Sequence, residues 1–140
     1  MDLKAYMRQA FTIKRLINAS KSRIEELQAM AEWARGVGLK VQASRKIDPM
    51  GDLIATITDQ KECLLRDCSR LMELQREIKD VTELVKRDEY RLILSERYVK
   101  LKSWETIATE CNYSLTHVMR IHRRAMLELQ NAMLGYSKGD

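Results

Sequence analysis

Glycine, proline and aromatic residues are scarce in this chain of 140 residues, which has five glycines, a single proline and only 6% Phe, Trp and Tyr. Leu, Met, Glu, Lys, Arg, Ala and Gln fill most of the sequence, and this mixture favours helices over strands. The length suits one ordinary domain, or a small globular module attached to an extended one. We therefore expect an all-α protein.

Long apolar runs are also missing. No stretch approaches the roughly 20 apolar residues that are needed to span a bilayer, and the first four residues, Met1 to Lys4, lack the apolar core of a secretory signal. We expect a cytoplasmic protein that does not contact a membrane.

Metal-binding and catalytic patterns are absent too. The cysteines, Cys63, Cys68 and Cys111, form no C-x-x-C pair, so we interpret them as small buried apolar groups in a reducing compartment. His117 and His122 have no Ser, Cys or carboxylate in a triad relationship and are interpreted as surface polar residues. Without a phosphate-binding glycine loop or paired carboxylates, we expect no metal, no cofactor, no catalytic residue and no enzymatic activity.

Charged residues are abundant and of mixed sign. They make up 32% of the chain, with a formal net charge of +5 and an isoelectric point near 9.2. This excess is compatible with nucleic-acid binding, but a helical surface of mixed Lys and Glu is usually just solvated.

The first 86 residues carry two long stretches in which apolar residues recur every seven positions. Gly36 and Gly38 end the first stretch, since glycine adopts the left-handed helix cap without cost, and Asp48 with Pro49 starts the second. Residues 1–86 are therefore predicted to form a long helical hairpin that serves dimerisation or partner binding, and its thin core favours either a homodimer or a conditionally ordered N-terminal half. The repeating positions are Leu3, Tyr6, Ala10, Ile13, Ile17, Ser20, Ile24, Leu27, Ala31 and Ala34, then Leu53, Ile57, Gln60, Leu64, Asp67, Leu71, Leu74, Ile78, Val81 and Val85.

Residues 87–140 form the second predicted domain, with helices expected from Asp88 to about Leu101, from Ser103 to Cys111 and from Ser114 to about Leu134. Asp88, Ser103 and Ser114 are expected helix caps, and Asn112 tolerates a left-handed backbone. The small Ala108 beside Ile107, the turn at Asn112 and the apolar Val118 and Ile121 have the spacing of a helix-turn-helix, whose helices cross steeply through a short turn.

If that geometry holds, one face of the last helix points away from the core and can contact double-stranded DNA. Arginine reads guanine edges or contacts phosphates, and Thr and His can hydrogen-bond to bases or backbone. Lys102, and Lys100 beside it, could touch flanking phosphates. The predicted DNA-binding residues are Ser114, Leu115, Thr116, His117, Met119, Arg120, Arg123, Arg124 and Lys102.

The same residues also have a simpler interpretation. The apolar pattern can be an ordinary core motif, and the arginines can form a solvated face. Trp104 and Tyr113 are better interpreted as core or turn anchors than as base-stacking groups. Spacing alone leaves both interpretations open.

Four segments carry a family resemblance: LSERYVKLKSWETIA at 94–108, NYS at 112–114, HV at 117–118 and IHRRA at 121–125. Over roughly residues 88–130 they resemble region four of sigma factors. More narrowly, they resemble the ArpU- and RinA-like late transcription regulators of phages and prophages of Gram-positive bacteria. Before residue 88 the likeness is limited to the long-helix layout and the Asp-Pro-Met-Gly restart.

The resemblance implies a DNA-binding transcriptional regulator, acting in the bacterial cytoplasm at the nucleoid, that activates late phage genes and contacts promoter DNA and host RNA polymerase. The groove-facing positions would be Leu115, Thr116, His117, Met119 and Arg120, with Ser114 near a phosphate. Leu115 and Met119 are apolar where sigma factors usually carry polar residues, so we do not expect an ordinary promoter element as the target. The region that melts promoter DNA is also missing, so we do not expect a complete sigma factor.

Two alternatives to a regulator remain from the sequence. The DNA-recognition subunit of a phage packaging terminase also combines a helix-turn-helix with long helices, but it works as a ring. A structural coiled-coil adaptor would use the same helices to bind protein.

Overall fold

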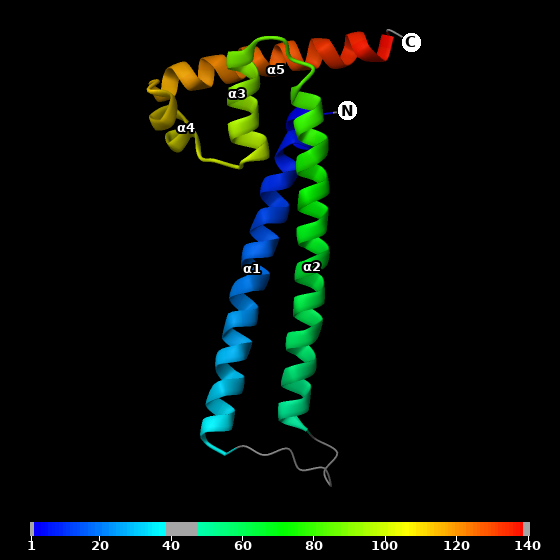
Figure 1. The fold of residues 1–140 in the computed structure, drawn as a ribbon, viewed down its shortest axis with the longest axis vertical. Helices are drawn as coiled ribbons and strands as arrows, with labels where there is room; N and C mark the ends of the chain where they lie inside the picture. Colours follow the sequence, from blue (N-terminus) through cyan, green and yellow to red (C-terminus); the bar gives the residue numbers. More distant parts are fainter. Residues whose placement is uncertain (1, 39–47, 139–140) are drawn as a thin grey trace. The chain divides into compact units, whose positions relative to one another are not determined.

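The computed structural model describes residues 2–38 and 48–138, and the regular structure in these residues is entirely helical (Figure 1). The expectation of an all-α protein is confirmed. Within the described residues, no helix combines the length and the apolar character that crossing a membrane requires.

The described helices follow the predicted order along the chain. The helix expected to run from Asp88 to about Leu101 changes character at Ser95, where α-helix gives way to a π-helical segment. The elements are α1 (Leu3–Gly36), α2 (Pro49–Thr82), α3 (Asp88–Leu94), η1 (Ser95–Val99), α4 (Trp104–Cys111) and α5 (Leu115–Lys138).

The chain divides into two compact units, and both long helices contribute to each. We call Met1–Thr12 with Leu71–Asp140 the terminal unit, and Ile13–Arg70 the middle unit. This division differs from the domain boundary expected near residues 86 and 87, because the first turns of α1 and the last turns of α2 belong with the C-terminal helices.

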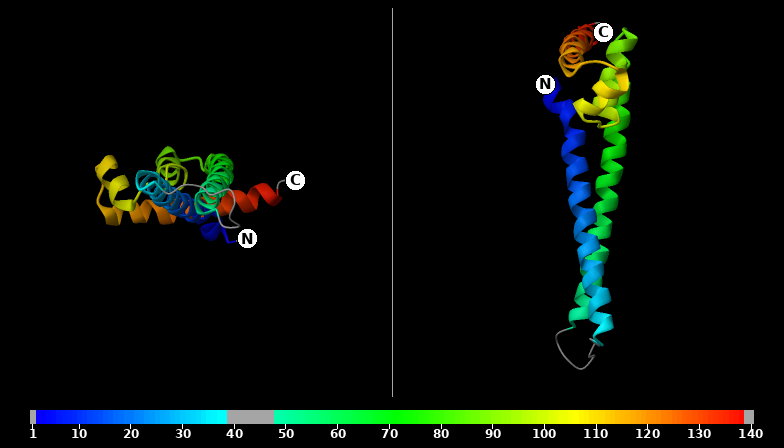
Figure 2. Two further views of the ribbon diagram at one scale, coloured as in Figure 1. Left: turned by 90° about the horizontal axis from the view of Figure 1, so that it is seen from below. Right: turned by 90° about the vertical axis from the view of Figure 1, so that its left-hand side faces the viewer.

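In the middle unit, the parts of α1 and α2 run side by side in opposite directions (Figures 1 and 2). Ile17, Ile24 and Leu27 of the seven-residue pattern are buried. The facing positions of α2 are only half-buried, and they include the polar Gln60 and Asp67. The pattern therefore identified the sheltered side of both helices, and the contact is looser on α2, where polar residues interrupt the pattern.

The ends of the long helices also follow the sequence. Gly38 has a φ of +74°, and its amide donates to the Arg35 carbonyl at 3.1 Å. At the start of α2, Asp48 accepts a hydrogen bond from the Gly51 amide at 2.9 Å, so the expected cap is confirmed. The sequence between the two long helices, from Gly36 to about Lys46, is expected to be a polar connection, and most of it lies outside the described residues.

The terminal unit has a denser core. Met7 of α1, Ile78 of α2 and Ile93 of α3 are fully buried, and so is Leu129 of α5. Helices α3 and α4 both pack against α5. These two short helices therefore hold one side of α5 away from solvent.

The start of α3 differs from expectation. Arg87, in an extended conformation, occupies the cap position and no side chain caps the helix, whereas Asp88 lies inside the first turn and pairs with Arg91. The prediction that Asp88 caps α3 is wrong. A carboxylate in the first turn still favours the helix, because the N-terminal end carries partial positive charge.

The segment after α3 has unusual backbone geometry. In η1 the Lys100 amide donates to the Ser95 carbonyl at 2.9 Å, five residues back, and the Lys102 amide donates to the Glu96 carbonyl at 3.1 Å. Leu101 then adopts a φ of +58° although it is not glycine. Since a side chain disfavours this region by about 1–2 kcal/mol, burial of Leu101 against the unit must offset the strain.

Candidate nucleic-acid interface

A serine side chain caps the start of both α4 and α5, and the connection between the two helices is short. The Ser103 side chain accepts a hydrogen bond from the Thr106 amide at 3.2 Å, and the Ser114 side chain accepts one from the His117 amide at 3.1 Å. Between the helices Asn112 is left-handed, with φ 58° and ψ 38°. The two predicted serine caps and the predicted left-handed residue are confirmed, so local sequence signals set the geometry of this connection.

The inward side of the pair is also as predicted. Ile107 of α4 and Val118 of α5 are fully buried, Ile121 is 4% exposed and Ala108 is 7% exposed. A small residue at position 108 lets α4 approach α5 closely, and the two apolar side chains of α5 fix which face turns inward.

The opposite side of α5 faces solvent. His117 is half-buried because its ring meets the Tyr113 ring edge-on, with centroids 4.6 Å apart. Part of this face is hollowed, and Leu115, Thr116, Met119, Arg120 and Arg123 line the depression, which we call the recognition hollow. The predicted residues that are exposed are Ser114, Leu115, Thr116, Met119, Arg120, Arg123 and Arg124.

The charge on this face is uncompensated. Among the described residues, no carboxylate lies within 4 Å of the guanidinium groups of Arg120, Arg123 or Arg124. The first acidic residue of α5 is Glu128, and its carboxylate accepts a hydrogen bond from the Lys86 amide at 3.2 Å. Three exposed cations without a partner on one helix face make a site suited to an anionic polymer.

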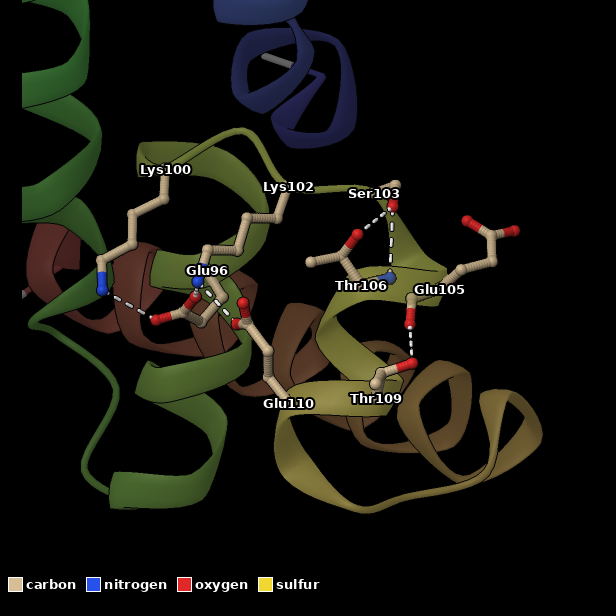
Figure 3. A network of polar contacts seen from close by, with 8 residues as sticks. All are labelled: Glu96, Lys100, Lys102, Ser103, Glu105, Thr106, Thr109 and Glu110. Carbon is tan, nitrogen blue, oxygen red and sulfur yellow. Dashed lines mark hydrogen bonds and ion pairs between the residues drawn. The ribbon is translucent and has the colours of Figure 1, made fainter.

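Lys102 differs from these arginines because it is paired with the carboxylates of Glu96 and Glu110 (Figure 3). Its ammonium nitrogen lies 2.5 Å from a Glu96 carboxylate oxygen and 2.6 Å from Glu110. Lys100 pairs with the other oxygen of Glu96 at 2.9 Å. Hydrogen bonds from Lys102 and then Lys100 lower the pKa of the buried Glu96 carboxyl. A phosphate contact by Lys102 would compete with two carboxylates, and that contact stays a prediction.

Sequence reasoning missed an aromatic and cationic cluster beside the site. The Arg97 guanidinium lies over the rings of Phe11 and Trp104, 4.3 and 4.5 Å from their centroids, and donates to the Lys102 carbonyl at 2.8 Å. Desolvation by burial lowers the pKa of Arg97. These contacts join α1, η1 and α4, three segments that no local pattern relates.

The prediction that His122 is a surface residue is wrong. It was expected at the surface, but it is half-buried, with Nε2 2.7 Å from the Tyr98 hydroxyl and its ring edge-on to Trp104. Burial, followed by repulsion from Lys4 and other cations, lowers its pKa to about 4. Helical spacing carried the signal, because His122 lies four residues after Val118 and so shares its inward side.

The cysteines are less buried than predicted, since Cys63, Cys68 and Cys111 are all half-exposed, and these three described cysteines form no disulfide with one another. Within residues 2–38 and 48–138, no three His, Cys, Asp or Glu side chains gather as a group that could hold a metal ion.

Comparisons of this chain with models of protein families, with curated proteins and with solved structures found no match.

Proposed function

We propose that this protein is a sequence-specific DNA-binding regulator of transcription, with α4 and α5 as a helix-turn-helix of the sigma region-four kind. The observation that carries this proposal is the exposed face of α5. In the described part of the chain, Arg120, Arg123 and Arg124 have no carboxylate within 4 Å, while Val118 and Ile121 hold the opposite face in the core. A rigidly held helix with a cationic, polar outer face can enter the major groove.

The first turns of α5 would contact base edges. Thr116 and Arg120 supply hydrogen-bonding groups, and the exposed Leu115 and Met119 supply apolar surface, which suits the methyl group of thymine. Arg123 and Arg124 lie further along the helix, where contact with phosphate would set the register on the duplex. In this division, the start of α5 recognises the base sequence and the following turns bind the phosphate backbone.

The wider role follows from the resemblance to phage late transcription regulators. In this role the N-terminal helices serve as a hairpin that mediates dimerisation or contact with host RNA polymerase, and the target is a promoter of late phage genes. The thin seam between the two helical segments of the middle unit, where α2 buries Met50 but leaves its other facing side chains half-buried, supports the need for a partner.

The test begins with selection of bound duplexes from a random-sequence pool, followed by gel-shift titration of the selected duplex at several salt concentrations. Binding should weaken steeply with salt, because each phosphate contact releases counterions. R120A/R123A/R124A should lose most of its preference for the selected duplex, and the slope of log K against log[salt] should fall by about 2 to 3 in magnitude.

A matched control removes three exposed arginines elsewhere. Arg15, Arg70 and Arg76 are exposed and outside the recognition hollow, so R15A/R70A/R76A changes the net charge equally. This control should keep the sequence preference. Equal affinity of wild type and R120A/R123A/R124A for the selected duplex, or no selected duplex at all, would overturn the proposal.

A further inference from the structure

A second hollow lies in the terminal unit beside the recognition hollow. Its lining comes from the first turns of α1, from η1, from α4 and from α5. It shares Met119 and Arg123 with the recognition hollow. The two depressions therefore meet along one side of α5, and a ligand that covers one also reaches the rim of the other.

The second hollow has an apolar floor that includes Trp104 and Met126, and cations predominate among its charged residues. Lys4, Arg8, Arg97 and Arg123 line it, against Asp2 as the single acidic residue. The Asp2 carboxylate accepts hydrogen bonds from the Lys4 and Ala5 amides at 3.1 and 3.3 Å, so it is engaged by the start of α1. Among the described residues, no carboxylate lies within 4 Å of any of the four cationic groups.

The positive charge acts on the groups buried behind it. Lys4, Arg97 and Arg8 each help, after burial, to lower the pKa of His122. Desolvation is the main reason why the pKa of Arg97 is lowered, and repulsion from Arg8 adds to it, whereas Tyr98 and the Glu105 carboxylate act in the opposite direction. Like charges that disfavour one another's charged forms mark a site where a bound anion would relieve the repulsion.

Arg97 differs from Lys4 and Arg8 in how firmly its side chain is held. Arg97 is held between the Phe11 and Trp104 rings and supplies a fixed charge. Lys4 and Arg8 are exposed, one helical turn apart on the same side of α1. Long exposed side chains next to a fixed positive charge can reach a phosphodiester backbone, although ordering them there costs rotamer freedom.

We propose that Lys4 and Arg8 form a second phosphate-contact surface, continuous through Arg123 with the recognition face of α5, so that bound duplex DNA is held by the start of α1 as well as by α5. This inference rests on the proposed function. The open form of the hollow and its continuity with the recognition hollow favour a polymer that runs across both. Contacts of this kind position the duplex and carry no sequence information.

The test compares K4A/R8A with a matched pair in full-length protein. Arg76 and Lys79 are exposed residues of the same unit that line neither hollow, so R76A/K79A removes the same charges. Both are titrated against the selected duplex and against an unrelated duplex between 50 and 200 mM salt, and thermal melts check that each is folded.

K4A/R8A should lose affinity for both duplexes by the same factor, and its salt slope should be about 2 smaller in magnitude than that of wild type. At about 0.9 per phosphate contact, two contacts change the slope by about 1.8, so over this fourfold salt range wild type should weaken about twelve-fold more than K4A/R8A. K4R/R8K should bind like wild type, because the charges remain, and R76A/K79A should keep a slope close to that of wild type.

Failure of this inference can be distinguished from failure of the proposed function. If wild type binds and R120A/R123A/R124A loses preference, but K4A/R8A behaves like R76A/K79A, this inference is overturned and the proposed function stands. A loss in K4A/R8A confined to the selected duplex would also overturn it, since it would indicate base reading. If wild type retains no duplex at low salt, both proposals fall.

Discussion

The Tyr98 hydroxyl lies 2.7 Å from Nε2 of His122, and this hydrogen bond joins η1 to α5. With its pKa lowered to about 4, His122 is neutral near pH 7, so Nε2 can accept a hydrogen bond from the Tyr98 hydroxyl. Lys4, Arg8 and Arg97 oppose a positive charge at this position. The folded protein therefore prefers a neutral imidazole that the unfolded chain does not require.

Stability should fall with mild acid for this reason. The pKa of His122 drops from 6.5 to about 4 on folding, so its contribution is complete above pH 6.5 and is lost as the pH falls through that interval. We expect the free energy of unfolding to be about 1 to 2 kcal/mol smaller at pH 5 than at pH 7, after allowance for partial exposure of the ring. Urea titration followed by circular dichroism at both pH values measures the difference.

The control for this prediction is H122Q, which keeps a hydrogen-bonding group without a titratable ring. Its stability should change little between pH 7 and pH 5. An identical loss of stability in wild type and H122Q would show that another group is responsible.

The left-handed turn between α4 and α5 should depend on Asn112. Its φ of 58° is tolerated by Asn and costs glycine nothing, whereas alanine lacks the side-chain hydrogen bonding that favours it. N112A should lower the free energy of unfolding by about 1 kcal/mol, while N112G should stay within about 0.5 kcal/mol of wild type. Chemical denaturation separates the two, and equal destabilisation by both would argue that side-chain contacts of Asn112 matter instead.

The ion-pair cluster around Glu96 should stabilise the junction between η1 and α4. Glu96 is 7% exposed and meets both Lys100 and Lys102, so E96Q removes a carboxylate with two ammonium partners. We expect a loss of about 1 to 3 kcal/mol in the free energy of unfolding. The exposed Glu73 has no ion pair among the described residues, and E73Q should cost less than about 0.5 kcal/mol.

The pH dependence supplies a second measurement for Glu96. Because its pKa is lowered in the folded state, its contribution is present above 4.5 and disappears as the pH falls further. The stability difference between wild type and E96Q should therefore shrink below that pH. A difference that stays constant down to pH 3 would contradict a role for the charged carboxylate.

Most of the secondary structure could be predicted because its signals are local. The seven-residue pattern identified the sheltered side of α1 through Ile17, Ile24 and Leu27, since the helix repeat alone decides which side chains share a face. Ser103, Ser114 and Asn112 marked the ends of α4 and α5 because caps act within three residues. The π-helical turn after Leu94 had no such signal and depends on how η1 is packed.

By itself, the sequence determined that the chain is helical, where most helices begin and end, and which side of α5 carries its exposed arginines. Only the tertiary structure decided which charges on the terminal unit are free. It pairs Lys102 with Glu96 and Glu110, and it brings Lys4 and Arg8 to the hollow that Arg123 borders. The reason is distance along the chain, because helix periodicity and caps act over a few residues, whereas these partners meet only when separate helices pack together.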